Sequence, residues 1–138
     1  MGDLMHIEYR TSGPIGPEAV SGLFAKAGLR RPIGDLERIR RMIDHADELF
    51  TAWDEDRLVG LIRAVTDYSY CCYISDLAVD RDYQGHGIGK QLVRLLKDKL
   101  GEEEIQYVLT STTKAAGFYE RIGFEKADKA YVIKRKSN

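Results

Sequence analysis

The apolar positions of this chain recur at two spacings, one typical of helices and one typical of strands. Apolar residues three and four apart predict helices at residues 17–27, 36–46, 88–100 and 113–122. Pro17 suits the first turn of the first helix, and Asp35 suits the N-cap of the second. Three of the four helices are followed at once by a glycine, where helices commonly end: Gly28, Gly101 and Gly123.

Shorter apolar or alternating runs predict strands at residues 6–10, 49–53, 58–65, 71–79, 105–109, 124–127 and 131–134. The run at 71–79 is dense in apolar residues, which indicates a central strand. Polar turns join neighbouring runs into antiparallel pairs, and the last two runs are expected to close the chain as a hairpin. The strands at 71–79 and 105–109 flank a helix, so we expect them to pair in parallel across that crossover.

This order of elements predicts an α/β fold of the α+β kind, formed by residues 1–138 as a single domain. We expect a mixed, mainly antiparallel sheet of about six to seven strands, flanked by about four helices. The chain has 138 residues, 43% hydrophobic and 31% charged, which is typical of a soluble domain with one packed core. Its net charge of −1 gives no electrostatic basis for nucleic acid or an anionic membrane as the main partner.

Targeting and redox signals favour a cytoplasmic protein. No apolar run approaches the ~18 residues of a membrane span, and Met1-Gly2-Asp3 does not begin a signal peptide. Cys71 and Cys72 are adjacent on an expected strand, so their side chains point to opposite faces. We therefore expect neither a structural disulfide nor a metal site.

The stretch at residues 81–90 carries the clearest candidate chemistry. Gly85, Gly87 and Gly89 leave the main chain open to a bulky anion, and the N-terminus of the following helix favours negative charge. Lys90 adds a positive charge. We interpret the stretch as a pyrophosphate-binding loop, the alternative being a glycine-rich turn without a ligand.

Two better-known phosphate loops do not fit this stretch. A Walker A loop ending at Gly89-Lys90 would need a glycine at Gln84 and a hydroxyl residue at Gln91. A dinucleotide fingerprint would need its third glycine where Lys90 or Leu92 stands.

The spacing Gln84-x-x-Gly87-x-Gly89 instead resembles the acyl-CoA loop of the GNAT superfamily of N-acetyltransferases. Two flanking segments extend the resemblance over approximately residues 49–134: Ile74-Ser75-Asp76-Leu77-Ala78-Val79 before the loop, and Ala115-Ala116-Gly117-Phe118-Tyr119-Glu120-Arg121-Ile122-Gly123-Phe124 after the next strand. The resemblance implies a GNAT-like fold with a splayed parallel strand pair and acetyl-CoA as the acetyl donor. It also implies a primary amine as acceptor (a small molecule, a protein lysine or an N-terminus) and, by family analogy, a homodimer.

The resemblance assigns roles to individual positions of this chain. The splayed strand, whose free backbone pairs with the pantetheine arm, corresponds to Leu77, Ala78 and Val79. The pyrophosphate would be bound by the backbone amides of Gln84, Gly85, His86, Gly87, Ile88, Gly89 and Lys90. The family's tyrosine near the acyl-CoA sulfur corresponds to Tyr119. Where the family often has an asparagine, this chain has Thr112, which offers a hydroxyl but not the paired donor and acceptor of an amide.

Acyl transfer to an amine needs a neutral amine, a donor for the oxyanion and a proton for the leaving thiolate. A phenol of pKa ~10 can protonate a thiolate whose conjugate acid is near ~8.5, so Tyr119 is our candidate general acid, the alternative being plain packing beside Phe118. A backbone N–H near Leu77 or Ala78 is the candidate oxyanion donor. Asp76, a charge within an apolar strand, could take the ammonium proton directly or through water; a salt bridge with an arginine is equally open.

The sequence is less specific about the residues that bind the acceptor amine. By position, the candidate acceptor-binding residues are Phe24, Arg30, Tyr68, Tyr70 and Tyr73. Aromatic rings can hold the apolar body of an amine or stack on a cation, although tyrosines on a sheet often only pack. The alternative function is a non-catalytic acyl-CoA-binding sensor or complex subunit of the same fold, which would bind the cofactor without turnover.

Overall fold

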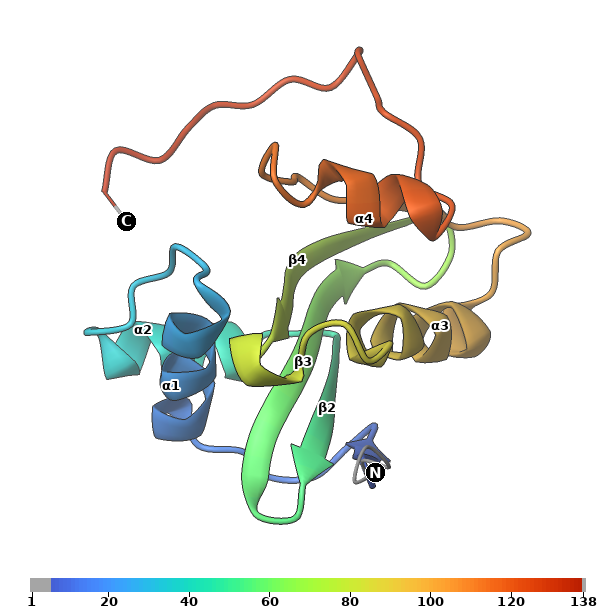
Figure 1. Ribbon diagram of the computed structural model, residues 1–138. Coiled ribbons are helices and arrows are strands. Elements are labelled where there is room, and N and C mark those ends of the chain that lie inside the picture. Colours follow the sequence, from blue (N-terminus) through green and yellow to red (C-terminus); the bar gives the residue numbers. More distant parts are fainter. Residues whose placement is uncertain (1–5, 138) are drawn as a thin grey trace.

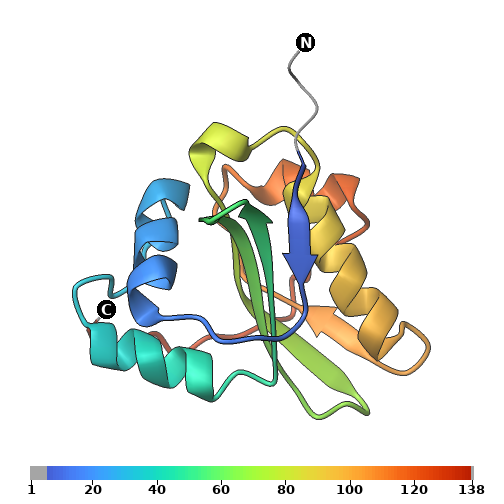
Figure 2. The same cartoon turned by 90° about the horizontal axis from the view of Figure 1, so that it is seen from below.

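In the computed structural model, which describes residues 6–137, a mixed sheet lies between two groups of helices (Figures 1 and 2). The order is β1 (Glu8–Arg10), α1 (Pro17–Ala27), α2 (Leu36–Asp44), β2 (Glu48–Asp54), β3 (Arg57–Thr66), β4 (Cys71–Val79), the 3-10 helix η1 (Arg81–Tyr83), α3 (Ile88–Leu100), β5 (Gln106–Val108) and α4 (Ala116–Arg121). The strands lie in chain order, β1 to β5. All neighbours are antiparallel except β4 and β5, which are parallel as expected.

Within residues 6–137, no helix is long and apolar enough to cross a membrane. Met1-Gly2-Asp3, from which we judged the absence of a signal peptide, lies outside the described residues.

The two faces of the sheet bury separate apolar clusters, because successive side chains of a strand point to opposite faces. One face packs against α3, with Leu92 and Leu96 fully buried in a cluster that includes Ile74 of β4. The other face packs against α1 and α2, where Phe24 and Ile39 are fully buried. Figure 2 shows α3 and the α1–α2 pair on opposite sides of the strands. The sheet thus separates two compartments, and β4 runs between them.

A β-bulge changes which face β4 presents to each compartment. Arg63 of β3 lies opposite Asp76, while its neighbour Ala64 lies opposite Ile74, so that Ser75 is the extra residue. Ile74 therefore faces α3, and Asp76, two positions on, faces the α1–α2 side of the sheet. This bulge places a carboxylate in the second compartment just before the segment that leads to the glycine loop.

The parallel pair of β4 and β5 is short and then opens. Its ladder consists of Cys71–Gln106, Cys72–Tyr107 and Tyr73–Val108. From Ile74 onward β4 continues to Val79 but pairs only with β3 among the described strands. The strands therefore diverge beyond Tyr73, as the resemblance implied.

The closing hairpin expected at residues 124–127 and 131–134 is wrong. Neither stretch is a strand, and the sheet of the described residues has five strands, not six or seven. Residues 125–137 instead leave α4 as an extended tail (Figure 1). An isolated two-stranded ribbon has too little apolar surface to hold together without a packing partner, and the sequence pattern records strand propensity without naming that partner.

Asp80 fixes the chain where it leaves β4. Its carboxylate is 1% exposed and accepts hydrogen bonds from Nη2 of Arg57 at 2.8 Å and from the backbone N–H of Asp82 at 3.0 Å. Burial by itself would raise the pKa of Asp80. The two donors outweigh burial, and the pKa is lowered.

Asp80→Ala is expected to lower the free energy of unfolding by ~1–3 kcal/mol, because it removes a buried acceptor from two donors. Since the folded pKa lies below the unfolded value, this contribution is present above about pH 4 and is lost as the pH falls through the folded pKa. Urea unfolding at neutral and acidic pH measures both effects.

Asp82→Ala is the matched control, since its exposed carboxylate also lies near Arg57, at 3.3 Å. It should change the stability by less than ~0.5 kcal/mol. Equal losses for the two variants would contradict the role given to Asp80.

Candidate functional site

The glycine loop lies where β4, α3 and α4 meet. Gly87 is the N-cap of α3 and has a φ of 84°, a left-handed conformation that favours glycine. A Cβ atom added to Gly89 would lie 3.2 Å from Cζ of Phe118 on α4, and 3.6 Å and 3.8 Å from the side chains of Val79 and Leu77 on β4. Gly89 therefore allows α3 to approach both neighbours closely, and the three segments singled out by the sequence come together here.

The start of α3 presents a set of hydrogen-bond donors without acceptors. None of the backbone N–H groups of residues 85–90 donates to an acceptor within residues 6–137, and the first bond back along the chain is from Gln91 N–H to Gly87 O at 3.0 Å. Lys90 is exposed at the same end of the helix. Nothing lies within 4 Å of the position that a Cβ of Gly87 would take, so the main chain at Gly87 is open to a bound group. Donors, helix dipole and Lys90 together suit a diphosphate.

The end of β4 lies beside these donors. Leu77, Ala78 and Val79 belong to the part of β4 that has left β5. Nε2 of Gln84 donates to the carbonyl oxygen of Val79 at 3.0 Å and ties the loop to the strand end. An extended chain such as a pantetheine arm could pair with this open edge as an added strand does.

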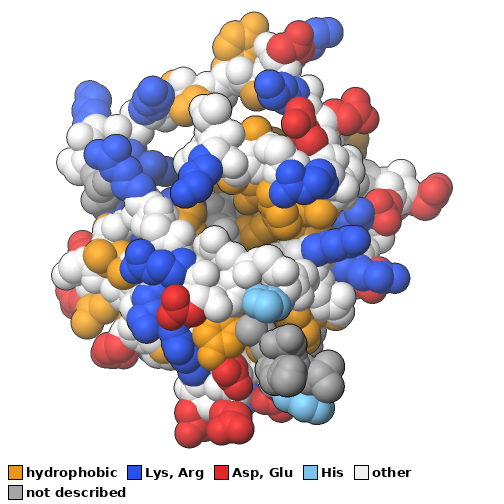
Figure 3. Space-filling model, viewed as in Figure 1, with side chains coloured by type: hydrophobic (Ala, Val, Ile, Leu, Met, Phe, Trp, Pro, Cys, Tyr) orange, Lys and Arg blue, Asp and Glu red, His pale blue; other side chains and the backbone are white. Residues whose placement is uncertain are grey.

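Figure 3 shows a hollow on the face seen in Figure 1. Hydrophobic side chains form its floor, and Lys and Arg side chains surround it. This distribution suits a ligand with a charged head and an apolar arm. The rim would bind the head, and the arm would lie along the floor.

Tyr119 on α4 is half-buried next to this region. Its ring packs edge-on against Phe118 and Phe124, with centroid distances of 5.2 Å and 5.6 Å. Burial raises the pKa of Tyr119, and the positive charge of Arg31 offsets part of that rise. The phenol is therefore protonated across the neutral range, and it lies within the field of a guanidinium that comes from the α1–α2 loop.

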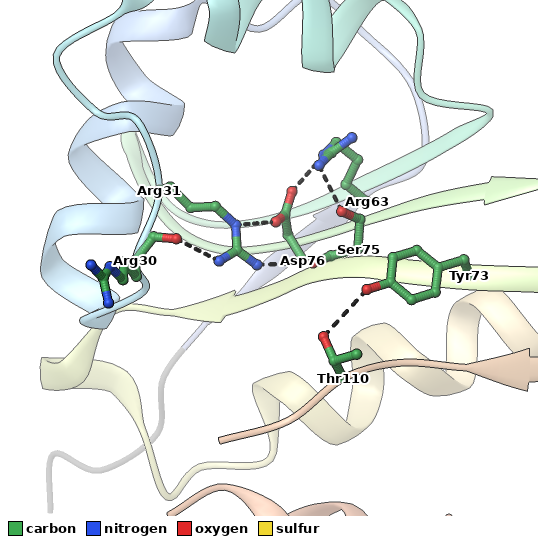
Figure 4. Close-up of polar contacts among 7 residues, drawn as sticks. All are labelled: Arg30, Arg31, Arg63, Tyr73, Ser75, Asp76 and Thr110. Carbon is green, nitrogen blue, oxygen red and sulfur yellow. Dashed lines mark hydrogen bonds and ion pairs between the residues drawn. The ribbon is translucent and has the colours of Figure 1, made fainter. Parts of the chain in front are cut away.

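Asp76 is 1% exposed and is bound by two guanidinium groups (Figure 4). Nε of Arg31 donates to Oδ1 at 2.6 Å, and Nε of Arg63 donates to Oδ2. The same arginines secure the bulge, because Nη2 of Arg31 donates to the carbonyl oxygen of Ser75 at 2.9 Å and Nη2 of Arg63 donates to its hydroxyl at 2.8 Å. This arrangement is the salt bridge that the sequence left open as an alternative. Because both carboxylate oxygens already bind cations, Asp76 is poorly placed to accept an ammonium proton.

Arg31 and Arg63 are the residues of this site that sequence reasoning did not name. Arg30, which it did name, is exposed and contributes only its carbonyl oxygen, which accepts from Nη1 of Arg31 at 2.8 Å (Figure 4). Arg30 and Arg31 are adjacent in the sequence, and nothing in their spacing shows which of the two side chains turns inward.

Three acceptor candidates lie away from the loop. Phe24 is 0% exposed within the core of the α1–α2 side. Tyr68 and Tyr70 belong to the turn between β3 and β4, and Leu77 is seven residues beyond Tyr70, about 23 Å along an extended strand. The hydroxyl of Tyr68 donates to Glu48 at 2.7 Å, and that bond is the main cause that raises its pKa to about 12. Tyr68 and Tyr70 are therefore not brought to the site. Phe24 is buried behind it, and its ring centroid lies 5.9 Å from Cζ of Arg31.

Tyr73 and Thr112 remain near the opening between the strands. The hydroxyl of Tyr73 lies 3.3 Å from Oγ1 of Thr110, so it bridges β4 and the chain after β5 at the point of divergence (Figure 4). The hydroxyl oxygen of Thr112 accepts from the backbone N–H of Ala115 at 3.2 Å and supports the turn before α4. The hydroxyl hydrogen of Thr112 stays available for a ligand.

The comparison with protein families decides what kind of domain this is. A family model described as "Acetyltransferase (GNAT) family" matches residues 18–124. The chain belongs to the GNAT family of acetyltransferases. The fold and the resemblance inferred from the loop are thereby confirmed.

Individual relatives are more distant or match over part of their length. GCN5-related N-acetyltransferase 2, chloroplastic, from Arabidopsis thaliana is 38% identical over 72 residues, 51% of this chain and 28% of that protein. Serotonin N-acetyltransferase 2, chloroplastic, from Oryza sativa subsp. japonica is 29% identical over 123 residues, 83% of this chain and 59% of that protein. The chain thus spans between 28% and 59% of these curated GNAT relatives.

The fold recurs in a solved structure. The probable acetyltransferase SA2161 from meticillin-resistant Staphylococcus aureus superposes with a TM-score of 0.81 at 23% identity, over 94% of this chain and 100% of that one. At this identity the likeness establishes the GNAT fold alone.

Asp76→Ala is expected to lower the free energy of unfolding by ~3 kcal/mol, because it leaves two partly buried guanidinium groups without their acceptor. Asp76→Asn keeps a polar oxygen of the same shape and should cost less. Guanidinium or urea unfolding monitored by circular dichroism gives both values.

Asp44→Ala serves as the control for removal of a carboxylate, since its pair with Arg40 is an exposed i,i+4 pair at 3.4 Å. Its expected cost is ~0.5 kcal/mol or less. If Asp76→Ala cost no more than this control, the ion pairs would not be structural.

Proposed function

We propose that this protein is an N-acetyltransferase that moves an acetyl group from acetyl-CoA to a primary amine. The observation that carries the proposal is the row of unbonded N–H groups at residues 85–90 beside the unpaired edge of β4. Donors for a diphosphate and an edge for an extended amide chain meet at one corner, and coenzyme A has both parts.

The residues at this corner fit the cofactor as the resemblance implied. The amides of residues 84–90 and the charge of Lys90 would bind the pyrophosphate, and the backbone of Leu77, Ala78 and Val79 would pair with the pantetheine arm. The hydroxyl of Thr112 would add one further contact near α4. When bound, acetyl-CoA supplies the activated thioester carbonyl, and positioning it next to the amine could account for ~7 kcal/mol or more of the barrier.

Tyr119 is proposed as the general acid. Its hydroxyl donates to no partner within residues 6–137, and its raised pKa keeps the proton in place until a thiolate forms next to it. A backbone N–H at Leu77 or Ala78 would stabilise the oxyanion by ~3 kcal/mol. We assign removal of the ammonium proton to a water molecule, since Asp76 is held by Arg31 and Arg63. Asp76 is then a positioning residue that fixes Arg31.

The acceptor is proposed to approach from the α1–α2 side of the sheet. Arg31, Tyr73 and the backbone of the α1–α2 loop lie there, on the face of β4 to which the bulge turns Asp76 (Figure 4). A small-molecule amine and a protein lysine or N-terminus both remain candidate acceptors. The name of one relative, serotonin N-acetyltransferase, favours arylalkylamines as the first compounds to include in a panel.

A second candidate function is a non-catalytic acyl-CoA-binding sensor or subunit of a complex. It is favoured by one observation: the single carboxylate that the sequence offered as a general base is neutralised by two arginines. Such a protein would bind acetyl-CoA without turnover on any amine.

We also propose a cytoplasmic location and a homodimer. Cys71 and Cys72 are both free thiols, which suits a reducing compartment. Three relatives are named as chloroplastic, and that word describes those proteins. Fractionation of the source cells would separate the two locations.

Acetyl-CoA is expected to raise the melting temperature more than ATP does, because a ligand that binds the folded state alone stabilises it. Gly87→Ala should reduce this shift, since the new methyl group occupies the open space beside the main chain of Gly87. Differential scanning fluorimetry over a range of ligand concentrations measures the effect.

Gly28→Ala is the matched control, at the C-terminus of α1. Gly28 has a φ of 73° and is left-handed like Gly87, and it likewise has nothing within 4 Å of its Cβ position. Both variants should lose ~1 kcal/mol of stability from left-handed strain. Only Gly87→Ala should weaken binding of acetyl-CoA, and equal effects on binding would place the diphosphate elsewhere.

Tyr119→Phe is expected to lower kcat by ~10²-fold or more with the best acceptor, while the thermal shift with acetyl-CoA is retained. Because the pKa of Tyr119 is raised above about 10, its ionisation should reduce activity only above that pH. Thiol release from acetyl-CoA in the presence of an amine panel provides the rates.

Tyr68→Phe, at the far end of β4, is the control and should leave kcat unchanged. Unchanged turnover in Tyr119→Phe would remove the general-acid role. A wild-type protein that binds acetyl-CoA and acetylates no amine would favour the sensor.

A further inference from the structure

The cluster of Asp76, Arg31 and Arg63 carries one more positive charge than negative charge. Both guanidinium groups pair with the single carboxylate of Asp76, and neither pairs with any other carboxylate of residues 6–137. The side chains of Arg31 and Arg63 are 25% and 12% exposed, so water screens the excess charge only in part. Partly buried charges are normally paired, which indicates that an anion from outside the chain completes the cluster.

Arg31 is the more exposed of the two arginines, and it has hydrogen-bond donors in reserve. A guanidinium carries five N–H groups. Arg31 uses three of them: Nε donates to Asp76 at 2.6 Å, Nη1 donates to the carbonyl oxygen of Arg30 at 2.8 Å, and Nη2 donates to that of Ser75 at 2.9 Å. Each Nη atom therefore keeps one N–H that has no acceptor within residues 6–137.

These two N–H groups form the outer fork of the guanidinium. Figure 4 shows the bonds from Arg31 to Arg30 and to Ser75 leaving Nη1 and Nη2 on opposite sides, so the edge between the two nitrogens stays open. The open edge points towards the side of β4 on which Thr110 lies (Figure 4). Two parallel N–H groups on a planar cation match the two oxygens of a carboxylate.

The fork lies close to the proposed proton source. The positive charge of Arg31, and not that of Arg63, offsets part of the rise in the pKa of Tyr119. An anion bound to the fork of Arg31 would therefore lie near the phenol, where the thioester and the amine are proposed to react.

The surrounding charge also favours an acceptor with a negative group. Lys and Arg side chains surround the hollow in Figure 3. Positive charge around a concave surface raises the local concentration of anions. An ammonium ion without a negative group would be repelled by the excess charge of the cluster, whereas the carboxylate of a zwitterion compensates that charge.

We propose that the acceptor is a primary amine with a carboxylate close to its nitrogen, as in an α-amino acid, and that the outer fork of Arg31 binds this carboxylate. The inference rests on the proposed function, because it names the acceptor class for the same site. A single carbon joins the two groups of an α-amino acid, so a carboxylate held by Arg31 keeps the amine beside it. Arg31 is then a residue that determines specificity.

The carboxylate stays unchanged during the reaction. The ammonium first loses a proton to water, and its nitrogen then forms a bond to the acetyl carbon as the C–S bond breaks. The leaving thiolate takes the proton of Tyr119. A second proton passes from the nitrogen to water, and water returns one proton to the phenol.

Pairs of acceptors that differ only by the carboxylate test the proposal. Suitable pairs are alanine and ethylamine, leucine and isopentylamine, and tryptophan and tryptamine, which cover small, aliphatic and aromatic side chains. For the side chain that fits, kcat/KM should be about tenfold or more higher for the amino acid than for the plain amine. Thiol release from acetyl-CoA provides the rates.

The methyl ester and the amide of the best amino acid separate a carboxylate from a neutral carbonyl group. Loss of the negative charge makes the amine easier to deprotonate, so reactivity alone would favour both derivatives. Recognition by Arg31 predicts that both are poor acceptors. The amide also stands for the N-terminus of a peptide, so efficient acetylation of the amide would indicate a peptide acceptor and overturn the proposal.

Arg31→Lys keeps the positive charge but removes the fork. It should reduce the ratio of kcat/KM for the amino acid to kcat/KM for its plain amine about tenfold. Arg63→Lys is the matched control, because it alters the other arginine that binds Asp76. A purely structural role predicts that both variants slow the two acceptors alike, so only Arg31→Lys should change the ratio.

Calorimetric titration of the complex with CoA measures the contact without acetyl transfer. Tighter binding of an amino acid than of its plain amine, lost in Arg31→Lys, would support the carboxylate site even if no amine were acetylated, and the proposed function alone would fail. Equal use of amino acids and plain amines, or equal ratios in the two variants, would overturn this inference and leave the proposed function standing. A protein that neither binds nor acetylates any of these acceptors would overturn both.

Discussion

The ion pairs of Asp76 with Arg31 and Arg63 hold together the part of this protein in which the two substrates would meet. Asp76 belongs to β4, Arg63 to β3 and Arg31 to the loop between α1 and α2, so one buried carboxylate joins three segments. The same arginines bind both polar groups of Ser75, the bulged residue. A buried carboxylate that binds two cations through both of its oxygens is held in one position, and removing it would leave two guanidinium groups without their acceptor. The α1–α2 loop, where we propose that the acceptor binds, is therefore fixed to β4, where we propose that the cofactor binds.

The divergence of β4 and β5 connects the two compartments that the sheet otherwise separates. On the α3 side lie the donors of the glycine loop and the side chains of Leu77 and Val79; on the other side lie Arg31 and Tyr73. An acetyl group that ends a chain bound on the first side can meet an amine that arrives from the second. The architecture thus explains how a thioester and an amine could come together without sharing one pocket.

Most of the fold followed from periodicity, because long amphipathic segments such as residues 88–100 record which of their faces is buried. The glycine loop could be recognised from spacing, since the left-handed φ of Gly87 and the close packing at Gly89 both favour glycine. The partner of Asp76 did not follow, because an ion pair depends on which side chains the folded chain brings together over long separations. The bulge at Ser75 could likewise not be predicted from the sequence. Without this bulge, Asp76 would face α3.

The closing hairpin failed for a related reason. Residues 131–134 have strand propensity, but propensity does not specify a neighbouring strand with which the segment pairs. The aromatic residues at 68 and 70 misled in a different way. Their position next to a central strand was correct, but they stand at the end of β4 that is remote from the loop.

The short helix α4 has no fully buried residue, yet it carries Tyr119 and touches α3 through Phe118 at Gly89. An element with so little buried surface opens locally at small energetic cost, well before the domain unfolds. A ligand that lies along β4 would supply the contacts that α4 lacks. Binding of acetyl-CoA would then order α4 and position the hydroxyl of Tyr119 in the same step. A thioester that fits poorly would leave α4 without these contacts and Tyr119 out of position.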